Sequence, residues 1–240
     1  MFRPGRFTGL REAPTGDNTL DNLCVHDRVL DLVEALLGTS DIRLYQAETF
    51  AKFSGQESFN QPLHIDETNH TLLPPRRDGL FRQVQLFVYL SDVTEARGAT
   101  HVVSNTRTAG IPNTDFYFPG TDRVMDEHEA SADGPAGSVL AYSADTVHRG
   151  TDMTEPGASR FFFNLAYREA GADWMGALPF PRRGIDPRVP VWIQQLSTRQ
   201  LCAIGFPPPT HPYWDEETLA ATQARYPEMD LTDFRVHQSG

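Results

Sequence analysis

Residues 83–90 read QVQLFVYL, and the alternation within this stretch decides the class of fold. Side chains of an extended chain point alternately to two faces, so the aliphatic residues share one face and the glutamines and aromatic residues share the other. An aliphatic face needs a helix or a second sheet against it, whereas a face of glutamines and aromatic rings suits the wall of a ligand-sized cavity. Residues 160–167 repeat the design, with Phe161, Phe163, Leu165 and Tyr167 on one face and Arg160, Phe162, Asn164 and Ala166 on the other.

The sequence on both sides of this stretch predicts further elements. Residues 42–53 are strand-like and end before Gly55, and residues 137–142 (GSVLAY) form another candidate strand after a turn. Ahead of them, residues 20–37 carry an apolar stripe with helical spacing, and Gly38 ends it. We therefore expect a mainly β protein, a jelly-roll or cupin-like barrel with helices packed on one outer face.

The length of 240 residues fits a single domain over residues 1–240. We expect a lead-in and helix over 1–41, a barrel core over 42–168 and a proline-rich tail over 169–240 that wraps the core. The polar, turn-rich residues 106–135 predict an insertion loop in the core. The tail contains a short helical pattern near residues 216–226.

The composition argues against several partners. The 21 Lys and Arg residues against 32 Asp and Glu residues give a net charge of −11, which disfavours a nucleic-acid partner. No run reaches the roughly 18 apolar residues of a membrane span, and the opening MFRPGRFTGLREAPTG has no apolar signal-peptide core. Cys24 and Cys202 form no CxxC pair, so we expect a cytoplasmic protein without disulfides. The oligomeric state is left open.

Several common catalytic patterns do not occur in the sequence. The single lysine, Lys52, lies outside any glycine-rich loop, and neither GxGxxG nor GxSxG is found. A nucleotide-binding loop and a serine-hydrolase elbow are therefore not supported. No catalytic dyad stands out, so we expect no catalytic residues beyond those that hold a metal.

Three residues form a candidate metal site. His64 and Asp66, in LHID, are two positions apart, so in an extended chain both side chains point the same way. His148, in SADTVHRG, follows the GSVLAY strand, and neighbouring strands of a jelly roll could bring it alongside. Two imidazoles and one carboxylate on one face of a metal leave the other face open, which suits non-heme Fe(II) that binds a co-substrate and O₂.

Other polar residues are candidates for ligand contacts. Arg160 begins a strand on the face that it shares with Asn164, where it either binds a ligand carboxylate or pairs with an acid of the protein. His70, in DETNH, either faces the pocket or lies in a solvated loop. Together with Gln85 on the cavity face of its strand, His70 and Asn164 are the expected substrate-pocket residues.

Three blocks of the sequence resemble one known family. They are QPLHID at 61–66, VQLFVYLSDVTEARGATHVVSNT at 84–106 and GSVLAYSADTVHRGTDMTEPGASRFFFNLAYR at 137–168. In this order they resemble the phytanoyl-CoA dioxygenase family of Fe(II)- and 2-oxoglutarate-dependent oxygenases, which fold as a double-stranded β-helix. The resemblance implies that His64, Asp66 and His148 are iron ligands and that Arg160 holds the distal carboxylate of 2-oxoglutarate, with O₂ as the second co-substrate.

The sequence departs from the family at one position near the expected co-substrate. Many members have a serine two positions after the second histidine, and here that position is Gly150. We expect Thr151 or Gln83 to supply the missing hydrogen bond to 2-oxoglutarate.

The resemblance implies an oxygenase that hydroxylates a small organic molecule. A CoA thioester would favour a basic entrance, but Arg76 and Arg77 offer only a small one on a chain of net charge −11. We therefore expect a small metabolite or a natural-product intermediate as substrate. Two alternatives stay open: a metal-dependent cupin-like isomerase or hydrolase that does not use 2-oxoglutarate, and a non-catalytic binding protein on the same fold.

Overall fold

The computed structural model describes residues 9–12, 18–55, 60–76, 78–109, 127–176, 188–195, 198, 201 and 206–235. The strands are β1 (Gly9–Glu12), β2 (Ile42–Phe53), β3 (Gln83–Tyr89), β4 (Thr100–Val103), β5 (Glu129–Ser131), β6 (Val139–Tyr142), β7 (His148–Gly150) and β8 (Ser159–Glu169). The helices are α1 (Asn18–Asp21), the 3₁₀ helix η1 (Asn22–Val25), α2 (Asp27–Leu37), α3 (Glu67–His70), α4 (Asn105–Thr108), α6 (Arg188–Ile193), α8 (Glu216–Arg225) and α9 (Thr232–Arg235).

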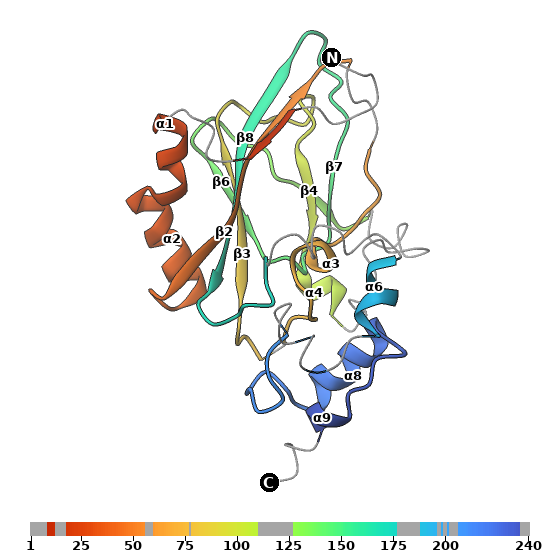
Figure 1. Cartoon of the computed structure of the whole chain (residues 1–240). Helices are drawn as coiled ribbons and strands as arrows, with labels where there is room; N and C mark the ends of the chain where they lie inside the picture. The colour runs from red at the N-terminus through yellow and green to blue at the C-terminus, as the bar shows by residue number, and fades with distance from the viewer. Residues whose placement is uncertain are drawn as a thin grey trace.

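Two antiparallel sheets form the core of the molecule, which confirms the mainly β, double-stranded β-helix fold (Figure 1). The larger sheet has the strand order β1-β2-β8-β3-β6, and the smaller sheet has the order β5-β4-β7. A single antiparallel bridge, between His64 and His148, ties the segment before α3 to β7. This bridge brings two distant parts of the sequence to one place in the fold.

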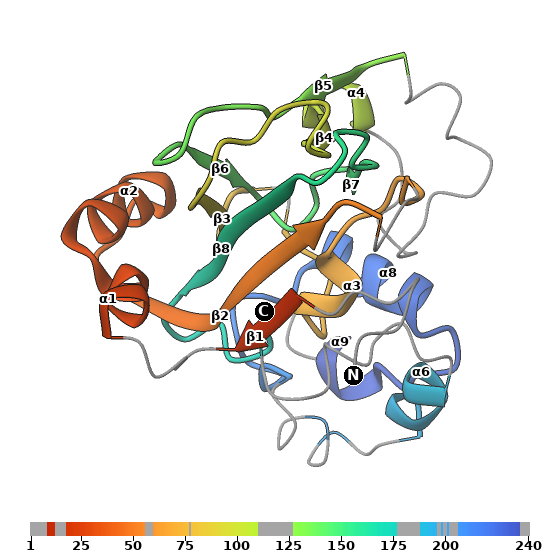
Figure 2. The ribbon, with the colours of Figure 1, turned by 90° about the horizontal axis from the view of Figure 1, so that it is seen from above.

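The two faces of β3 have the environments that the alternation predicts. Its aliphatic residues join those of β8 in a cluster with Val29, Val33 and Leu37 of α2. Its aromatic residues lie on the opposite face, in a separate cluster inside the barrel. Figure 2 shows α2 beside the sheet on its outer side. The helix therefore buries the aliphatic face, and the polar face is left to line the interior.

The N-terminal apolar stripe ends where the sequence predicts. Gly38 has φ of 71°, a left-handed conformation that a glycine adopts without a Cβ penalty, and its N–H donates to the Glu34 carbonyl. The stripe is not one helix, however, because the chain is helical in three short pieces before residue 38. The His26 side chain caps the last of them by accepting a hydrogen bond from the N–H of Arg28.

The expected insertion over residues 106–135 is only partly a loop. Its first residues belong to α4, and β5 pairs with β4 in the smaller sheet. β5 has only three residues, too few for an alternation of faces to show in the sequence, and its pairing with β4 makes it part of the sheet. Residues 110–126 lie outside the described part of the chain.

The tail packs around the segment that follows α3. Leu72 and Leu73 join a cluster formed mainly by tail residues, among them Trp174, Trp214 and Phe234. The expected helix near residues 216–226 is α8, which Asp215 caps through a reciprocal capping box with Thr218. In both views α2 lies along the larger sheet, and α6, α8 and α9 of the tail lie away from it (Figures 1 and 2). Within the ranges given above, no helix is long and apolar enough to cross a membrane.

Candidate metal centre

His64, Asp66 and His148 form one compact group of potential ligands. The ligand atoms of the three side chains all lie within 4.8 Å of one another. His148 Nε2 lies 3.4 Å from Asp66 Oδ2, and His64 Nε2 lies 3.9 Å from Asp66 Oδ1. The backbone bridge between the two histidines, with N–O distances of 2.9 and 3.0 Å, fixes this approach.

Backbone carbonyls hold the two imidazole rings in the orientation that a metal needs. His64 Nδ1 lies 2.8 Å from the Pro62 carbonyl oxygen, and His148 Nδ1 lies 2.9 Å from that of Thr146. A carbonyl can only accept, so each Nδ1 carries a proton, and Nε2 is the nitrogen of each ring that can bind a metal. Both Nε2 atoms face Asp66. The donor set therefore fits a divalent metal bound by two histidines and one carboxylate.

Two further side chains hold the Asp66 carboxylate. Gln85 Nε2 donates to Asp66 Oδ2 over 3.1 Å, and the Tyr142 hydroxyl lies 3.2 Å from the same oxygen and 3.1 Å from Gln85 Oε1. Burial and the nearby Asp66 carboxylate raise the pKa of Tyr142 well above its usual value, so its hydroxyl stays a donor. Asp66 is thus fixed on one side and keeps Oδ1 for a metal.

The electrostatics of the group favour an ionised Asp66 carboxylate, a neutral His64 imidazole and a protonated His148 imidazole. Burial raises the pKa of Asp66, but the nearby imidazoles, His148 first, lower it more, so the net pKa lies well below its usual value. Burial and the neighbouring His148 lower the pKa of His64. Burial also lowers the pKa of His148, but Asp66 outweighs burial and raises it overall. A divalent cation would take the place of the proton on His148 that faces Asp66.

Arg160 and Lys52 lie together at one end of the barrel interior. They are direct partners in the pairing of β8 with β2, and their exposed fractions are 5% and 8%. The Arg160 guanidinium donates to the Gly98 carbonyl, and Lys52 Nζ donates to the Thr151 carbonyl. Two buried cations at one place suit an anionic ligand.

A row of ring contacts connects the metal centre to Arg160. His148 lies 4.9 Å from Tyr142, Tyr142 lies 5.3 Å from Phe87, and Phe87 stacks on Phe162 at 4.3 Å, all between ring centroids. Arg160 completes the row, with its guanidinium carbon 4.8 Å from the centre of the Phe162 ring. This aromatic wall has the candidate metal ligands at one end and the guanidinium of Arg160 at the other.

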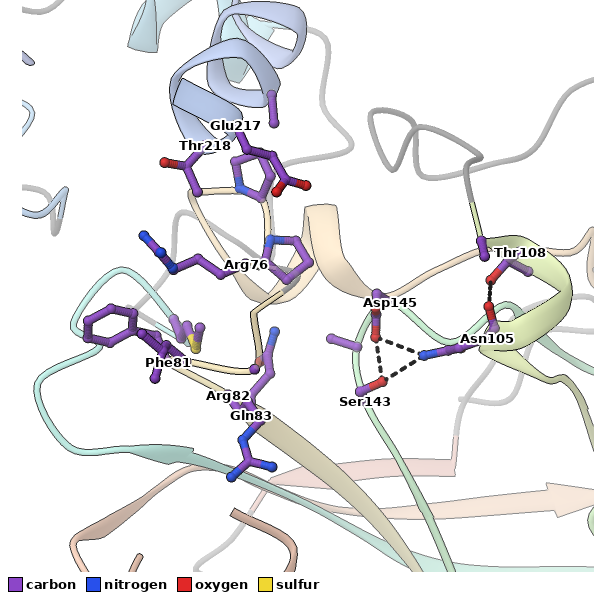
Figure 3. Close-up of a pocket in the computed structure, with 18 of the residues that line it drawn as sticks. Arg76, Phe81, Arg82, Gln83, Asn105, Thr108, Ser143, Asp145, Glu217 and Thr218 are labelled. Atoms are coloured by element: carbon purple, nitrogen blue, oxygen red, sulfur yellow. Dashed lines mark hydrogen bonds between the residues drawn. The ribbon is translucent and has the colours of Figure 1, made fainter. Parts of the chain in front are cut away.

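Figure 3 shows a cavity of about 590 Å³ whose described lining contains none of the three candidate metal ligands. Its lining includes Gln83 and Ser143. Gln83 is two residues along β3 from Gln85, about 7 Å at the rise of a strand, and Ser143 directly follows Tyr142. Gln85 and Tyr142 both contact Asp66, so two of the lining residues are close neighbours along the chain of the residues that hold this carboxylate.

The structure separates the residues expected to bind the co-substrate. Thr151 lies next to Lys52, but its hydroxyl donates to the Ala99 carbonyl over 2.7 Å. Gln83 pairs with Arg168, at the end of β8 opposite Arg160, and lines the cavity instead. At Gly150, the position at which the family resemblance leads one to expect serine, a Cβ would lie only 2.9 Å from Gln61 Oε1, which accepts the Gly150 N–H.

None of the three expected substrate-pocket residues lines the cavity directly. Gln85 is fully buried against Asp66. Asn164 is buried on the interior face of β8 and bonds Glu48. His70 is buried, and its Nδ1 lies 3.2 Å from the Tyr45 hydroxyl, through which it reaches Gln83. The three residues are therefore buried next to the metal centre or the cavity lining and do not line the cavity themselves.

Sequence reasoning missed Lys52, Tyr45 and Tyr142 as residues of the site. Tyr142 is the last residue of the GSVLAY strand, which precedes His148. The alternation along that strand could have indicated that its side chain faces the interior. Lys52 carried a signal too, because a lone lysine in a strand is unusual in a barrel interior. Tyr45 carried none.

Comparisons with solved structures give relatives of the same fold. The chain is similar to the epimerase SnoN in complex with Fe³⁺, alpha ketoglutarate and nogalamycin RO, with 21% identity, a TM-score of 0.59 and coverage of 75% of this chain and 72% of that chain. It is similar to the non-heme alpha ketoglutarate dependent carbocyclase SnoK from nogalamycin biosynthesis, with 17% identity, a TM-score of 0.57 and coverage of 75% and 72%. HygX from Streptomyces hygroscopicus, in its apo form, matches at 16% identity and a TM-score of 0.50, over 68% and 72%.

At such identities these structures show the fold alone, and the search of curated proteins finds no match. The family comparison goes further. The model described as phytanoyl-CoA dioxygenase (PhyH) matches residues 2–160, a stretch that includes all three residues of the metal centre and ends at Arg160. The chain therefore belongs to the phytanoyl-CoA dioxygenase family.

Proposed function

We propose that this protein is an Fe(II)- and 2-oxoglutarate-dependent dioxygenase that hydroxylates a small organic metabolite or a natural-product intermediate. One observation carries the proposal: the ligand atoms of His64, Asp66 and His148 lie within 4.8 Å of one another, and a row of ring contacts joins His148 to the buried Arg160. A dicarboxylic co-substrate would lie along this row, and an organic substrate would enter from the cavity that Gln83 and Ser143 help to line. Family membership and the iron- and 2-oxoglutarate-bound relative SnoN support this assignment.

Iron bound with 2-oxoglutarate would activate O₂ for oxidation of a nearby substrate, with release of succinate and CO₂. The chain supplies the ligand set, and Asp66 offsets part of the metal charge. Gln85 and Tyr142 keep the carboxylate in place by occupying Oδ2. The protein therefore binds and orients, and the reaction needs no separate general base.

The co-substrate site would use the arginine end of the aromatic wall. Arg160 is suited to a bidentate contact with the distal carboxylate, and Lys52 adds a second positive charge beside it. Phe87 and Phe162 would cover the hydrocarbon part of the molecule. Thr151, whose carbonyl accepts from Lys52, lies three residues beyond His148. Three residues of extended chain span about 10 Å, which is the approximate distance from the metal to the two cations.

Two alternatives make different demands on the site. A metal-dependent isomerase or hydrolase would use the three ligands but would not need Arg160, and its turnover would survive without oxygen. A binding protein without turnover would not need to keep the complete ligand set and the arginine together, as this chain does. Relatives of this fold include an epimerase and a carbocyclase, so hydroxylation is tested by identifying the product and not by succinate formation.

Replacing Asp66 by alanine is expected to abolish turnover, because it removes the only carboxylate of the ligand group. The measurement is succinate formed from 2-oxoglutarate in air with Fe(II), alongside the affinity for Ni(II). We expect at least about a hundredfold loss of succinate formation and weaker metal binding. The control is Asp173→Ala, which removes an exposed carboxylate that pairs with Arg168.

Two results would count against the proposal. Full succinate formation in Asp66→Ala would show that this residue is not the carboxylate ligand. Turnover that continues in the unmodified protein without oxygen would favour an isomerase or a hydrolase. Chloride in the buffer should leave the product unchlorinated, because the Asp66 carboxylate would bind the metal where a halide would otherwise bind.

A further inference from the structure

The arginines that line the cavity are paired with carboxylates of the protein. Arg76 contacts Asp78 and lies 2.7 Å from Asp215, and Arg82 lies 3.5 Å from Glu169. Arg77, the other residue of the expected basic entrance, lies outside the described residues. An anionic ligand would have to compete with three carboxylates for these two arginines, so the described lining disfavours a phosphate or a carboxylate.

Asp145 lines the same cavity and has no cationic partner among the residues that the structure describes. Its Oδ1 accepts from the Ser143 hydroxyl and lies 3.4 Å from Asn105 Nδ2. Figure 3 shows Asp145 with these two residues, apart from the two arginines of the lining. The carboxylate is thus held through one oxygen, and the other oxygen is left for a ligand that donates a hydrogen bond.

A turn fixes Asp145 close to the metal centre. The Thr146 N–H donates to the Ser143 carbonyl over 2.9 Å, and the Thr146 carbonyl orients the His148 ring. Asp145 precedes His148 by three residues, and three residues of chain span at most about 10 Å. A molecule bound to Asp145 would therefore lie near the residues that hold iron in the proposed function.

We propose that the cavity binds an organic cation, a protonated amine with a hydrocarbon body, and that Asp145 recognises its ammonium group. This inference rests on the proposed function for the reaction and names the class of substrate. Leu80, Phe81 and Met175 supply hydrocarbon surface for the rest of the molecule. An acyl-CoA or another phosphorylated molecule does not match a lining in which both described arginines are paired and a carboxylate is left for a ligand.

The test compares two small probes of the same shape, 2-aminoindane, which is protonated at neutral pH, and 2-indanol, which is uncharged. Their affinities are measured by ligand-observed NMR with the metal-free full-length protein in the absence of 2-oxoglutarate, so the amine cannot bind a metal instead. The unmodified protein should bind the amine more tightly than the alcohol. In Asp145→Asn, which keeps the size and removes the charge, we expect the ratio of amine affinity to alcohol affinity to fall roughly three- to tenfold. Ser143→Ala should lower the ratio less, because the carboxylate remains but loses the hydroxyl that holds it.

The control is Asp41→Asn, the same change of charge at an exposed residue outside the described lining, where the carboxylate lies 2.7 Å from Arg43. This variant should keep the ratio of the unmodified protein. An unchanged ratio in Asp145→Asn, or an equal fall in Asp41→Asn, would overturn the inference, and so would an unmodified protein that does not prefer the amine. The probes need neither iron nor 2-oxoglutarate. Loss of the amine preference can therefore be told apart from a failure of the oxygenase assignment, which the succinate assay reports.

Discussion

Replacing Arg160 by alanine is expected to raise the Kd for 2-oxoglutarate steeply and to leave metal affinity almost unchanged. The guanidinium lies in the barrel interior at the far end of the aromatic wall from the metal ligands. Loss of a charge pair inside a cavity costs about 2–5 kcal/mol, which corresponds to roughly a thirty- to several-thousand-fold rise in Kd. Titration calorimetry with Ni(II) first, and then with 2-oxoglutarate, separates the two effects.

Two further variants make the result specific. Arg160→Lys keeps the charge but loses the two-pronged geometry, so its 2-oxoglutarate affinity should fall between those of the unmodified protein and Arg160→Ala. Arg168→Ala removes another arginine of the same strand, one that pairs with Asp173, and should leave 2-oxoglutarate affinity unchanged. A fall in Ni(II) affinity with no change for 2-oxoglutarate would mean that Arg160 is structural and that the anchor lies elsewhere.

Breaking the ion pair between Arg225 and Glu67 is expected to cost about 3–5 kcal/mol of folding free energy, because it leaves one buried charge without its partner. Arg225 reaches from α8 to Glu67, the residue after Asp66, and also donates to the Thr71 carbonyl over 3.4 Å. Both side chains are almost completely buried. Urea unfolding of Arg225→Met should show the loss, and Ni(II) affinity should fall with it since α3 begins at the metal ligand.

The double variant tests whether the charge or the packing matters. Glu67→Leu combined with Arg225→Met removes both charges, and most of the lost stability should return. Arg97→Met is the matched control, because Arg97 pairs with Glu155 at the surface and its loss should be close to the error of the measurement. A double variant no more stable than Arg225→Met would contradict the assigned role of the pair.

The local patterns predicted the sheet well because period-two burial acts within a single strand. The aliphatic and polar faces of β3 and β8, the bounds of β2 at 42–53 and the glycine that ends α2 all follow from short-range geometry. The division of residues 20–37 into three helical pieces depended on the cap at His26. The pairing of β5 with β4 depended on a long-range contact that no local pattern carries.

The roles of individual site residues were harder to predict than their faces. Gln83 and Gln85 share one face of β3, yet one lines the cavity and the other holds Asp66. Gln83 also accepts a hydrogen bond from Tyr45, which lies at an irregularity in the pairing of β2 with β8, between Leu44 and Gln46. Such a bulge re-aims one side chain, and alternation alone cannot anticipate it.

The central claim is that the His64–Asp66–His148 group and Arg160 together bind iron with 2-oxoglutarate. The most direct measurement is a visible absorption spectrum of the full-length protein with Fe(II), recorded without oxygen as 2-oxoglutarate is added. We expect a weak charge-transfer band that saturates with 2-oxoglutarate, does not form with succinate, which has no 2-oxo group, and needs far more 2-oxoglutarate in Arg160→Ala. No band at saturating 2-oxoglutarate in the unmodified protein would contradict the claim.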